Sequence, residues 1–280
     1  MQPNIQSVQK EIVIAAGQAE KQYWRDLWKY RELLYFLSWR DILVRYKQTE
    51  IGIAWALIRP FLTMVVFTIV FGNIAKLPSN GVPYPILIFS ALLPWQFFSS
   101  AMGECSNSLV GNANLISKVY FPRLIVPLSA VAVSFVDFML SGMILLGLMA
   151  WYNFVPSWRI LTLPLFVVIA AAAAIGIGLW FAALTVKYRD FRYIVPFVMQ
   201  FGLYISPVGF SSNIVPAQWR LLYSINPMVG VIDGFRWAIL GQEAAIYLPG
   251  FALSLSLVIL VLMSGVWYFR KVERTFADVI

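Results

Sequence analysis

The chain has 280 residues, of which 60% are hydrophobic and only 12% are charged. Soluble domains carry about 25% charged residues, so this composition excludes an ordinary soluble protein and predicts an all-α integral membrane protein. The apolar runs lack the alternation of β-barrel strands. With no histidine and one cysteine, a disulfide framework and a His/Cys metal site are excluded. The phosphate-binding motif G-x-x-x-x-G-K-[ST] is also absent.

Residues 1–22 are polar and predict a flexible cytosolic N-terminus rather than a cleaved signal peptide. Over 23–50, aromatic and aliphatic residues recur at three- and four-residue spacing, and charged residues fill the other faces. This pattern predicts an amphipathic helix that lies in the membrane interface. A helix packed on its own protein is the alternative.

Six apolar segments follow within 51–270, each close to the roughly 20 residues that cross a bilayer. They cover about 52–74, 85–105, 124–152, 160–186, 194–210 and 247–269. Six spans place both termini on one side, which holds 17 of the 21 Lys and Arg residues. The termini, including the tail 271–280, are therefore predicted to be cytoplasmic. The net charge of +8 reflects this orientation and not an affinity for nucleic acid.

The segment 106–123, SNSLVGNANLISKVYFPR, is a polar and basic break between two apolar spans. A stretch rich in Gly, Asn and Ser leads into a short helix-like piece, which Phe-Pro-Arg closes. A loop that only joins two membrane helices has no packing need for this pattern. The segment therefore predicts a shaped cytosolic knob that contacts another molecule.

The segment 207–242 is apolar, but prolines and glycines interrupt it and it carries charged residues. Non-helical backbone at membrane depth survives only when it is buried in protein or lines a water-filled cavity. We therefore expect two short helices that re-enter the membrane from the outer side, with a large outer loop as the alternative. Asp233 and Arg236 are three residues apart and are expected to pair on one helix face.

Two aromatic stripes are candidates for lining a path. Four rings in the fifth span fall within about 80° of one another on a helix, and a shorter pair lies in the first span. Aromatic faces stack on flat ligands with little demand for one orientation, which suits a sugar chain that slides. Helix packing or lipid contact is the alternative. The residues are Tyr193, Phe197, Phe201, Tyr204, Phe67 and Phe71.

Asp137 lies within a span, where a charge costs about 2.5–3.5 kcal/mol on insertion scales. A functional or packing partner is expected, and Ser134 and Ser141 are neighbours able to solvate it. Basic side chains also gather where the first span begins and are predicted to hold a lipid pyrophosphate. Contact with bulk anionic headgroups is the alternative. These basic residues are Arg40, Arg45, Lys47 and Arg59.

Four stretches carry a family resemblance, namely 31–60, 93–123, 186–193 and 226–241. They resemble the permease subunits of type-2 ABC transporters, in the branch that exports O-antigen and related polysaccharides. The resemblance implies a homodimer of six-span subunits in the bacterial inner membrane. It also implies two separate ATP-binding cassette subunits, which bind ATP and Mg, so that this chain binds no cofactor and is not itself an enzyme.

The resemblance assigns further roles. The 106–123 loop would be a coupling helix that docks on the ATPase through Asn114, Leu115, Lys118, Tyr120, Phe121, Pro122 and Arg123. The 23–50 helix would be the interface helix, in contact with membrane lipid. The 207–242 segment would be the outer gate, with Pro227, Asp233 and Arg236. The cargo would be a lipid-linked polysaccharide; teichoic acid, capsule, another lipid or a drug are alternatives, and a flippase or membrane glycosyltransferase is a different class.

Overall fold

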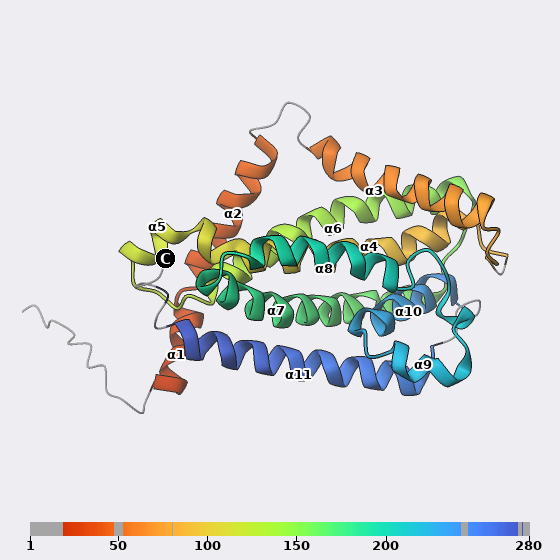
Figure 1. Cartoon of the computed structure of the whole chain (residues 1–280). Helices are drawn as coiled ribbons and strands as arrows, with labels where there is room; N and C mark the ends of the chain where they lie inside the picture. Colours follow the sequence, from red (N-terminus) through yellow and green to blue (C-terminus); the bar gives the residue numbers. More distant parts are fainter. Residues whose placement is uncertain (1–18, 48–52, 80, 242–245, 274–275, 277–280) are drawn as a thin grey trace, which may run out of the picture.

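The structure is a computed structural model that describes residues 19–47, 53–79, 81–241, 246–273 and 276. Within these described ranges, five helical stretches are long and apolar enough to cross a membrane, and they form one elongated bundle (Figure 1). The all-α integral membrane class is confirmed. The spans are α3 (Ile53–Phe67) continued by the π-helix η1 (Thr68–Ile74), α4 (Tyr84–Gly111), α6 (Ile125–Trp151), the 3-10 helix η2 (Trp158–Thr162) with α7 (Leu163–Lys187), and α11 (Leu248–Val272).

Helix α4 is the centre of the bundle. In its most apolar window 78% of the residues are buried, whereas the other four spans reach only 17–33%. It packs mainly against α6 and α7. The remaining spans therefore present most of their apolar surface outward, as helices in contact with lipid do.

The last span crosses α7 at two glycines. A Cβ atom on Gly265 would collide with the carbonyl oxygen of Gly176, and one on Gly176 would lie 2.7 Å from the amide nitrogen of Leu262. Small residues permit this close backbone approach, which replaces the hydrophobic effect as a source of helix association in lipid. One turn further along, the rings of Trp180 and Tyr268 stack at 4.1 Å between centroids.

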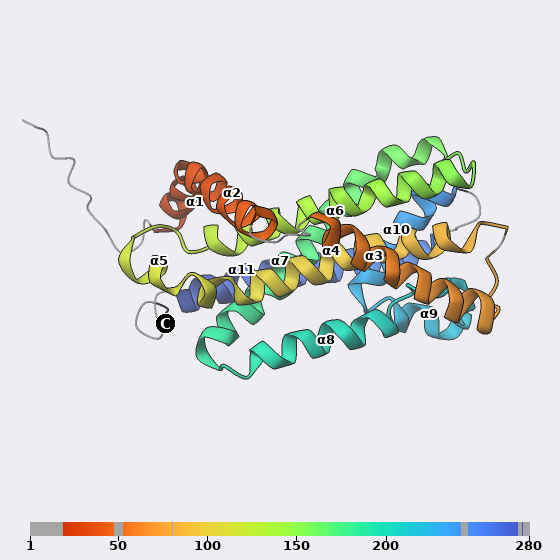
Figure 2. The ribbon, with the colours of Figure 1, turned by 90° about the horizontal axis from the view of Figure 1, so that it is seen from above.

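The predicted fifth span is shorter than expected. Helix α8 (Phe191–Ile205) has 15 residues, or about 22 Å at 1.5 Å per residue, which is less than the roughly 30 Å of hydrocarbon. It ends because Ser206 precedes Pro207 and adopts an extended conformation, with ψ 152°. The helix runs along the edge of the bundle (Figure 2), and Val195 is its one fully buried residue.

The predicted N-terminal helix is two helices, α1 (Ala19–Lys29) and α2 (Arg31–Lys47), separated at Tyr30. Helix α2 packs along α6 and exposes large aromatic side chains, among them Tyr35, Phe36 and Trp39. Residues 48–50 of the predicted helix lie outside the described residues.

Two short helices follow α8 at the end of the bundle opposite α1 (Figure 1). They are α9 (Ala217–Tyr223) and α10 (Pro227–Leu240), preceded by the 3-10 turn η3 (Ser212–Ile214). Asn226 caps α10 by accepting a hydrogen bond from the Met228 amide at 3.0 Å, and Pro227 stands at the first helical position, where no donor is lost. Helix α10 is buried against α4, α7 and α11.

Candidate functional site

The knob between α4 and α6 consists of the six-residue helix α5 (Ala113–Lys118) and the turn after it. Tyr120 is its most prominent side chain, 83% exposed, and Val119 beside it is 51% exposed. Phe121, in contrast, is only 4% exposed, and Pro122 is buried as well. The seven predicted coupling residues thus divide into exposed Asn114, Lys118 and Tyr120, half-buried Leu115 and Arg123, and buried Phe121 and Pro122.

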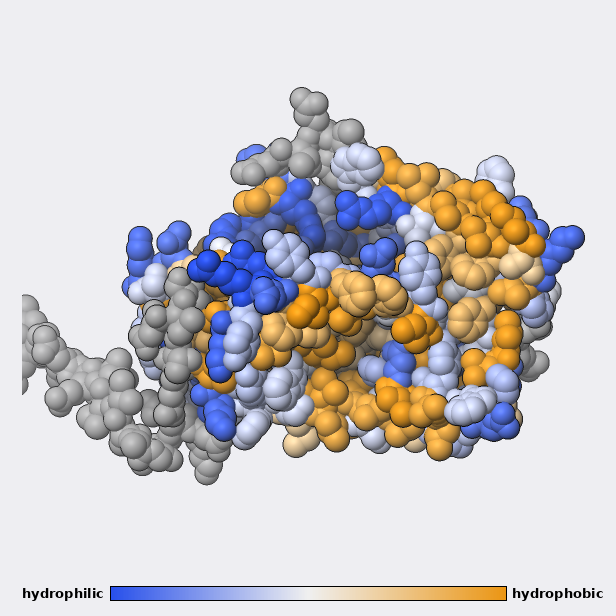
Figure 3. All heavy atoms as spheres, viewed as in Figure 1, coloured by the Kyte–Doolittle hydropathy of each residue, from blue (hydrophilic) through white to orange (hydrophobic). Residues whose placement is uncertain are grey.

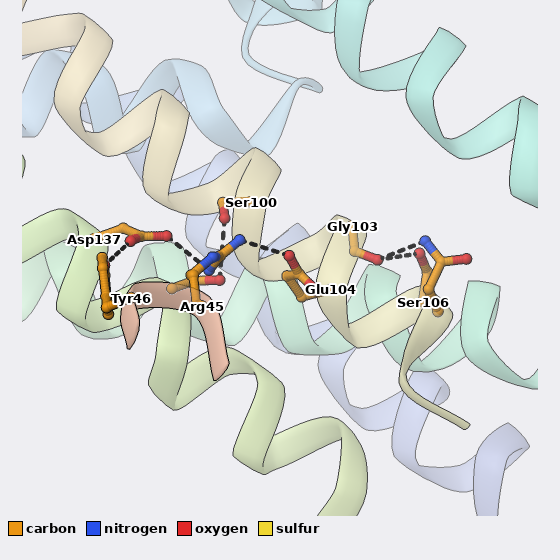
Figure 4. A network of polar contacts seen from close by, with 9 residues as sticks. Arg45, Tyr46, Ser100, Gly103, Glu104, Ser106 and Asp137 are labelled. Atoms are coloured by element: carbon orange, nitrogen blue, oxygen red, sulfur yellow. Dashed lines mark hydrogen bonds and ion pairs between the residues drawn. The ribbon is translucent and has the colours of Figure 1, made fainter. Parts of the chain in front are cut away.

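Arg45, at the end of α2, lies between two carboxylates of the bundle (Figure 4). Its Nη1 donates to Asp137 Oδ2 of α6 at 2.8 Å, and its Nη2 donates to Glu104 Oε1 of α4 at 2.7 Å. Tyr46 donates its hydroxyl to the other oxygen of Asp137. Burial and the Asp137 carboxylate raise the pKa of the Tyr46 phenol, so it remains a donor. Asp137 therefore finds its partners on α2.

Arg40 connects α2 to the knob. Its Nε donates to Asp41 Oδ1 at 2.8 Å, and its Nη2 donates at 2.8 Å to the side-chain oxygen of Asn112, the residue between α4 and α5. Two of the four predicted phosphate ligands, Arg40 and Arg45, are thus engaged within the chain. Lys47 and Arg59 are exposed and make no ion pair with any described residue.

The two predicted aromatic stripes have different surroundings. On α8 the four rings point outward, with exposed fractions from 51% for Phe201 to 82% for Tyr193. On the first span Phe67 is only 8% exposed. The ring of Phe71 covers Gly209, where a Cβ atom would lie 2.5 Å from it. The α8 row (Tyr193, Phe197, Phe201 and Tyr204) is therefore the one open aromatic surface of the two.

Asp233 and Arg236 interact through their charges but form no direct ion pair with each other. Arg236 is 2% exposed, and its guanidinium donates to the carbonyl oxygens of Phe210 at 2.6 Å and Val208 at 3.1 Å. These carbonyls belong to the non-helical stretch after α8, so they have lost their helical donors and need others. Asp233 lines a small cleft, together with Arg220.

A contact that sequence reasoning missed links the first helix to the end of the last span. The Tyr23 hydroxyl donates to Glu273 Oε2 at 3.0 Å, and the guanidinium of Arg270 lies 4.5 Å from the centre of the Tyr23 ring. Burial and the neighbouring Glu273 raise the pKa of the Tyr23 phenol. The partners are 250 residues apart, and no local pattern signals such a pair.

Residues 32–240 match the family described as ABC-2 type transporter. The chain is 28% identical over 214 residues to the O-antigen export system permease protein RfbA of Myxococcus xanthus, which covers 76% of this chain and 82% of that protein. A Klebsiella pneumoniae protein of the same name is 25% identical over 259 residues, with 89% and 95% covered. The polysialic acid transport protein KpsM of Escherichia coli is 24% identical over 210 residues, with 72% and 78% covered. The match to the family extends over more than half of this chain, and the spans of the chain are apolar helices. This chain therefore belongs to the ABC-2 type transporters as an integral membrane permease.

Proposed function

We propose that the chain is the membrane-spanning permease of an ATP-driven exporter that moves a lipid-linked polysaccharide of the O-antigen type to the periplasm. The observation that carries this proposal is the similarity, across 89% of the chain, to a permease of O-antigen export. The exposed α8 row supports a sugar cargo, because aromatic rings stack on a sliding chain without fixing its register. The likeness to KpsM, a polysialic acid transport protein, favours a polysaccharide of that type as the second candidate cargo.

The proposed partners are two ATP-binding cassette subunits, which hold ATP and Mg, and a second copy of this chain. The knob is the proposed docking element for the ATPase. This docking role is supported by the burial of some knob residues and the exposure of others. Phe121 and Pro122 anchor the turn in the bundle, and Tyr120 projects from it. Helix α2 is a proposed relay, because Arg40 contacts the start of the knob and Arg45 contacts α4 and α6.

In this proposal both termini lie in the cytoplasm of a bacterial cell, and the chain sits in the inner membrane. The cargo enters at the cytosolic end, where Lys47 and Arg59 contribute positive charge, and it leaves past α9 and α10, the proposed outer gate. Two copies placed with their α8 rows facing each other enclose the path. Helix α2 rests in the membrane interface, because its exposed aromatic side chains suit contact with lipid.

The test is co-purification of the partner from mild-detergent membranes with the tagged chain, followed by an ATPase assay. Tyr120→Ala should lose the P-loop ATPase while the permease stays intact on size-exclusion chromatography. Trp28→Ala is the matched control, because Trp28 is also an exposed aromatic residue, at 72%, but lies on α1 outside the knob. If the wild-type chain brings down no ATPase, or if Tyr120→Ala retains it at full yield, the docking proposal fails.

A second measurement addresses the cargo. Cells that depend on this chain should accumulate intracellular lipid-linked glycan when its gene is deleted, and surface glycan should return with the wild-type gene. Surface glycan that is unchanged by the deletion would contradict polysaccharide export.

A further inference from the structure

We propose that the turn between α7 and α8 is a second phosphate-binding site, which receives the phosphate groups of the glycan carrier beside the α8 row. The name basic turn is used here for Arg189 of this turn together with Lys187, the last residue of α7, and Arg192, the second residue of α8. The inference rests on the proposed function, since it names where that cargo would be held. It differs from the entrance predicted at the first span, half of whose basic side chains are engaged within the chain.

The charges of the basic turn are not neutralised by the described part of the chain. All three side chains are exposed, and neither Arg189 nor Arg192 makes a side-chain hydrogen bond or an ion pair with any described residue. The ammonium of Lys187 lies 5.1 Å from the centre of the Tyr188 ring. The turn carries one acid, exposed Asp190. Three cations within six consecutive residues repel one another, so binding of an anion at this turn is favoured.

Arginine suits a phosphate ligand by geometry as well as by charge. Its planar guanidinium presents paired N–H donors that match two phosphate oxygens. Arg40 and Arg45 already donate hydrogen bonds from their guanidinium groups to Asn112, Asp137 and Glu104. Arg189 and Arg192 donate to no described residue, so their guanidinium donors are available to a ligand.

The position of the turn specifies the rest of the ligand. Tyr193, the first ring of the α8 row, follows Arg192 directly, and the row continues to Tyr204, about 16 Å along the helix at 1.5 Å per residue. Gln200 is exposed on the same face, and its amide both donates to and accepts from hydroxyl groups. In Figure 3 the hydrophilic surface where α8 begins adjoins this row of mixed polarity. A charged end followed by rings and an amide matches a phosphate joined to sugars.

The same features argue against the other anions. A bulk lipid headgroup would interact with the charged side chains only and would make no contact with the row of rings or with Gln200. An acidic surface on the ATPase would also use the charges alone. The glycan carrier, with its phosphate next to sugar, uses both parts of the surface.

The experiment uses the complete complex with its ATPase, reconstituted in nanodiscs of zwitterionic lipid. The probe is a polyprenyl diphosphate, with the corresponding polyprenyl alcohol as the uncharged control, and binding is measured by native mass spectrometry. Arg189→Gln with Arg192→Gln should weaken diphosphate binding about tenfold for each arginine removed. Arg189→Lys with Arg192→Lys should fall in between, because charge is kept and the paired donors are lost.

The matched control is Arg25→Gln with Arg31→Gln, which removes the same charge from exposed arginines of α1 and α2. It should bind the diphosphate as the wild type does. Unchanged binding by the Arg189/Arg192 variant would overturn the inference. Equal competition by phosphatidylglycerol would identify a general headgroup site, and loss of the ATPase with intact diphosphate binding would identify a protein contact; either result overturns it. A wild-type complex that does not prefer the diphosphate over the alcohol would contradict the proposed function itself.

Discussion

Replacing Asp137 with alanine should loosen α2 from the bundle. Asp137 accepts one hydrogen bond from Arg45 and one from Tyr46, so a single carboxylate of α6 holds two side chains of α2. With alanine in its place, Arg45 keeps only Glu104, and the Tyr46 hydroxyl loses its acceptor. The proposed relay between the knob and the spans would then lose its firmest contact.

The size of the effect follows from exposure. Exposed ion pairs contribute about 0–1 kcal/mol, and breaking a buried pair costs about 3–5 kcal/mol. The side chains of Arg45 and Asp137 are 33% and 25% exposed, so we expect a loss of about 2 kcal/mol in the free energy of unfolding for Asp137→Ala. Glu104 is 47% exposed, and Glu104→Ala should cost less than about 1 kcal/mol.

The assay is thermal unfolding in detergent, followed by the loss of the monodisperse peak on size-exclusion chromatography. A double-mutant cycle with Arg45→Ala separates the pairwise interaction from the other effects of each substitution. We expect a coupling energy of about 1–2 kcal/mol for Arg45 with Asp137 and less than about 0.5 kcal/mol for Arg45 with Glu104. A coupling to Asp137 no larger than that to Glu104 would refute the reasoning from burial.

Three further outcomes are expected from the same unfolding assay. Gly265→Leu should destabilise the fold by more than about 2 kcal/mol, because the added side chain cannot fit against α7; an unchanged midpoint would contradict the close crossing. Phe121→Ala should cost about 3–5 kcal/mol through the cavity it leaves, and exposed Tyr120→Ala less than about 0.5 kcal/mol; equal losses would argue against the inward and outward division. Because the pKa of Tyr23 is raised, the unfolded chain releases this proton above about pH 10 while the folded protein keeps it. Stability should therefore fall as the pH rises above 10 more steeply in the wild type than in Tyr23→Phe, and identical slopes would contradict it.

Local patterns were enough to predict the helical class, the long apolar spans and the breaks between them. The length of α8 was overestimated because the predicted span included Pro207. A proline disfavours the helical conformation of the residue before it, so the helix ends there. The prolines and glycines of 207–242 did indicate short helices, since they break a helix wherever they occur.

The partners of the charged residues could not be predicted, for a physical reason. Lipid tails are as apolar as the interior of the bundle, so hydropathy does not say which face of a span meets protein. The sequence alone therefore did not identify the partner of Arg45. Only the packing of α2 along α6 places this side chain beside Asp137. Arg236 is a similar case, because its acceptors are backbone carbonyls, which every residue has and no sequence pattern marks.

The burial of α4 has a consequence for how the protein is made. Its principal neighbours, α6 and α7, lie after it in the chain and so leave the ribosome later. Until they arrive, most of the surface that α4 buries in the bundle has no protein partner, and its buried Ser90 and Ser106 hydroxyls donate only to carbonyl oxygens of α4 itself. We expect α4 to stay with the insertion machinery until α7 has emerged, so that assembly, and not insertion of each helix, sets the pace of biosynthesis.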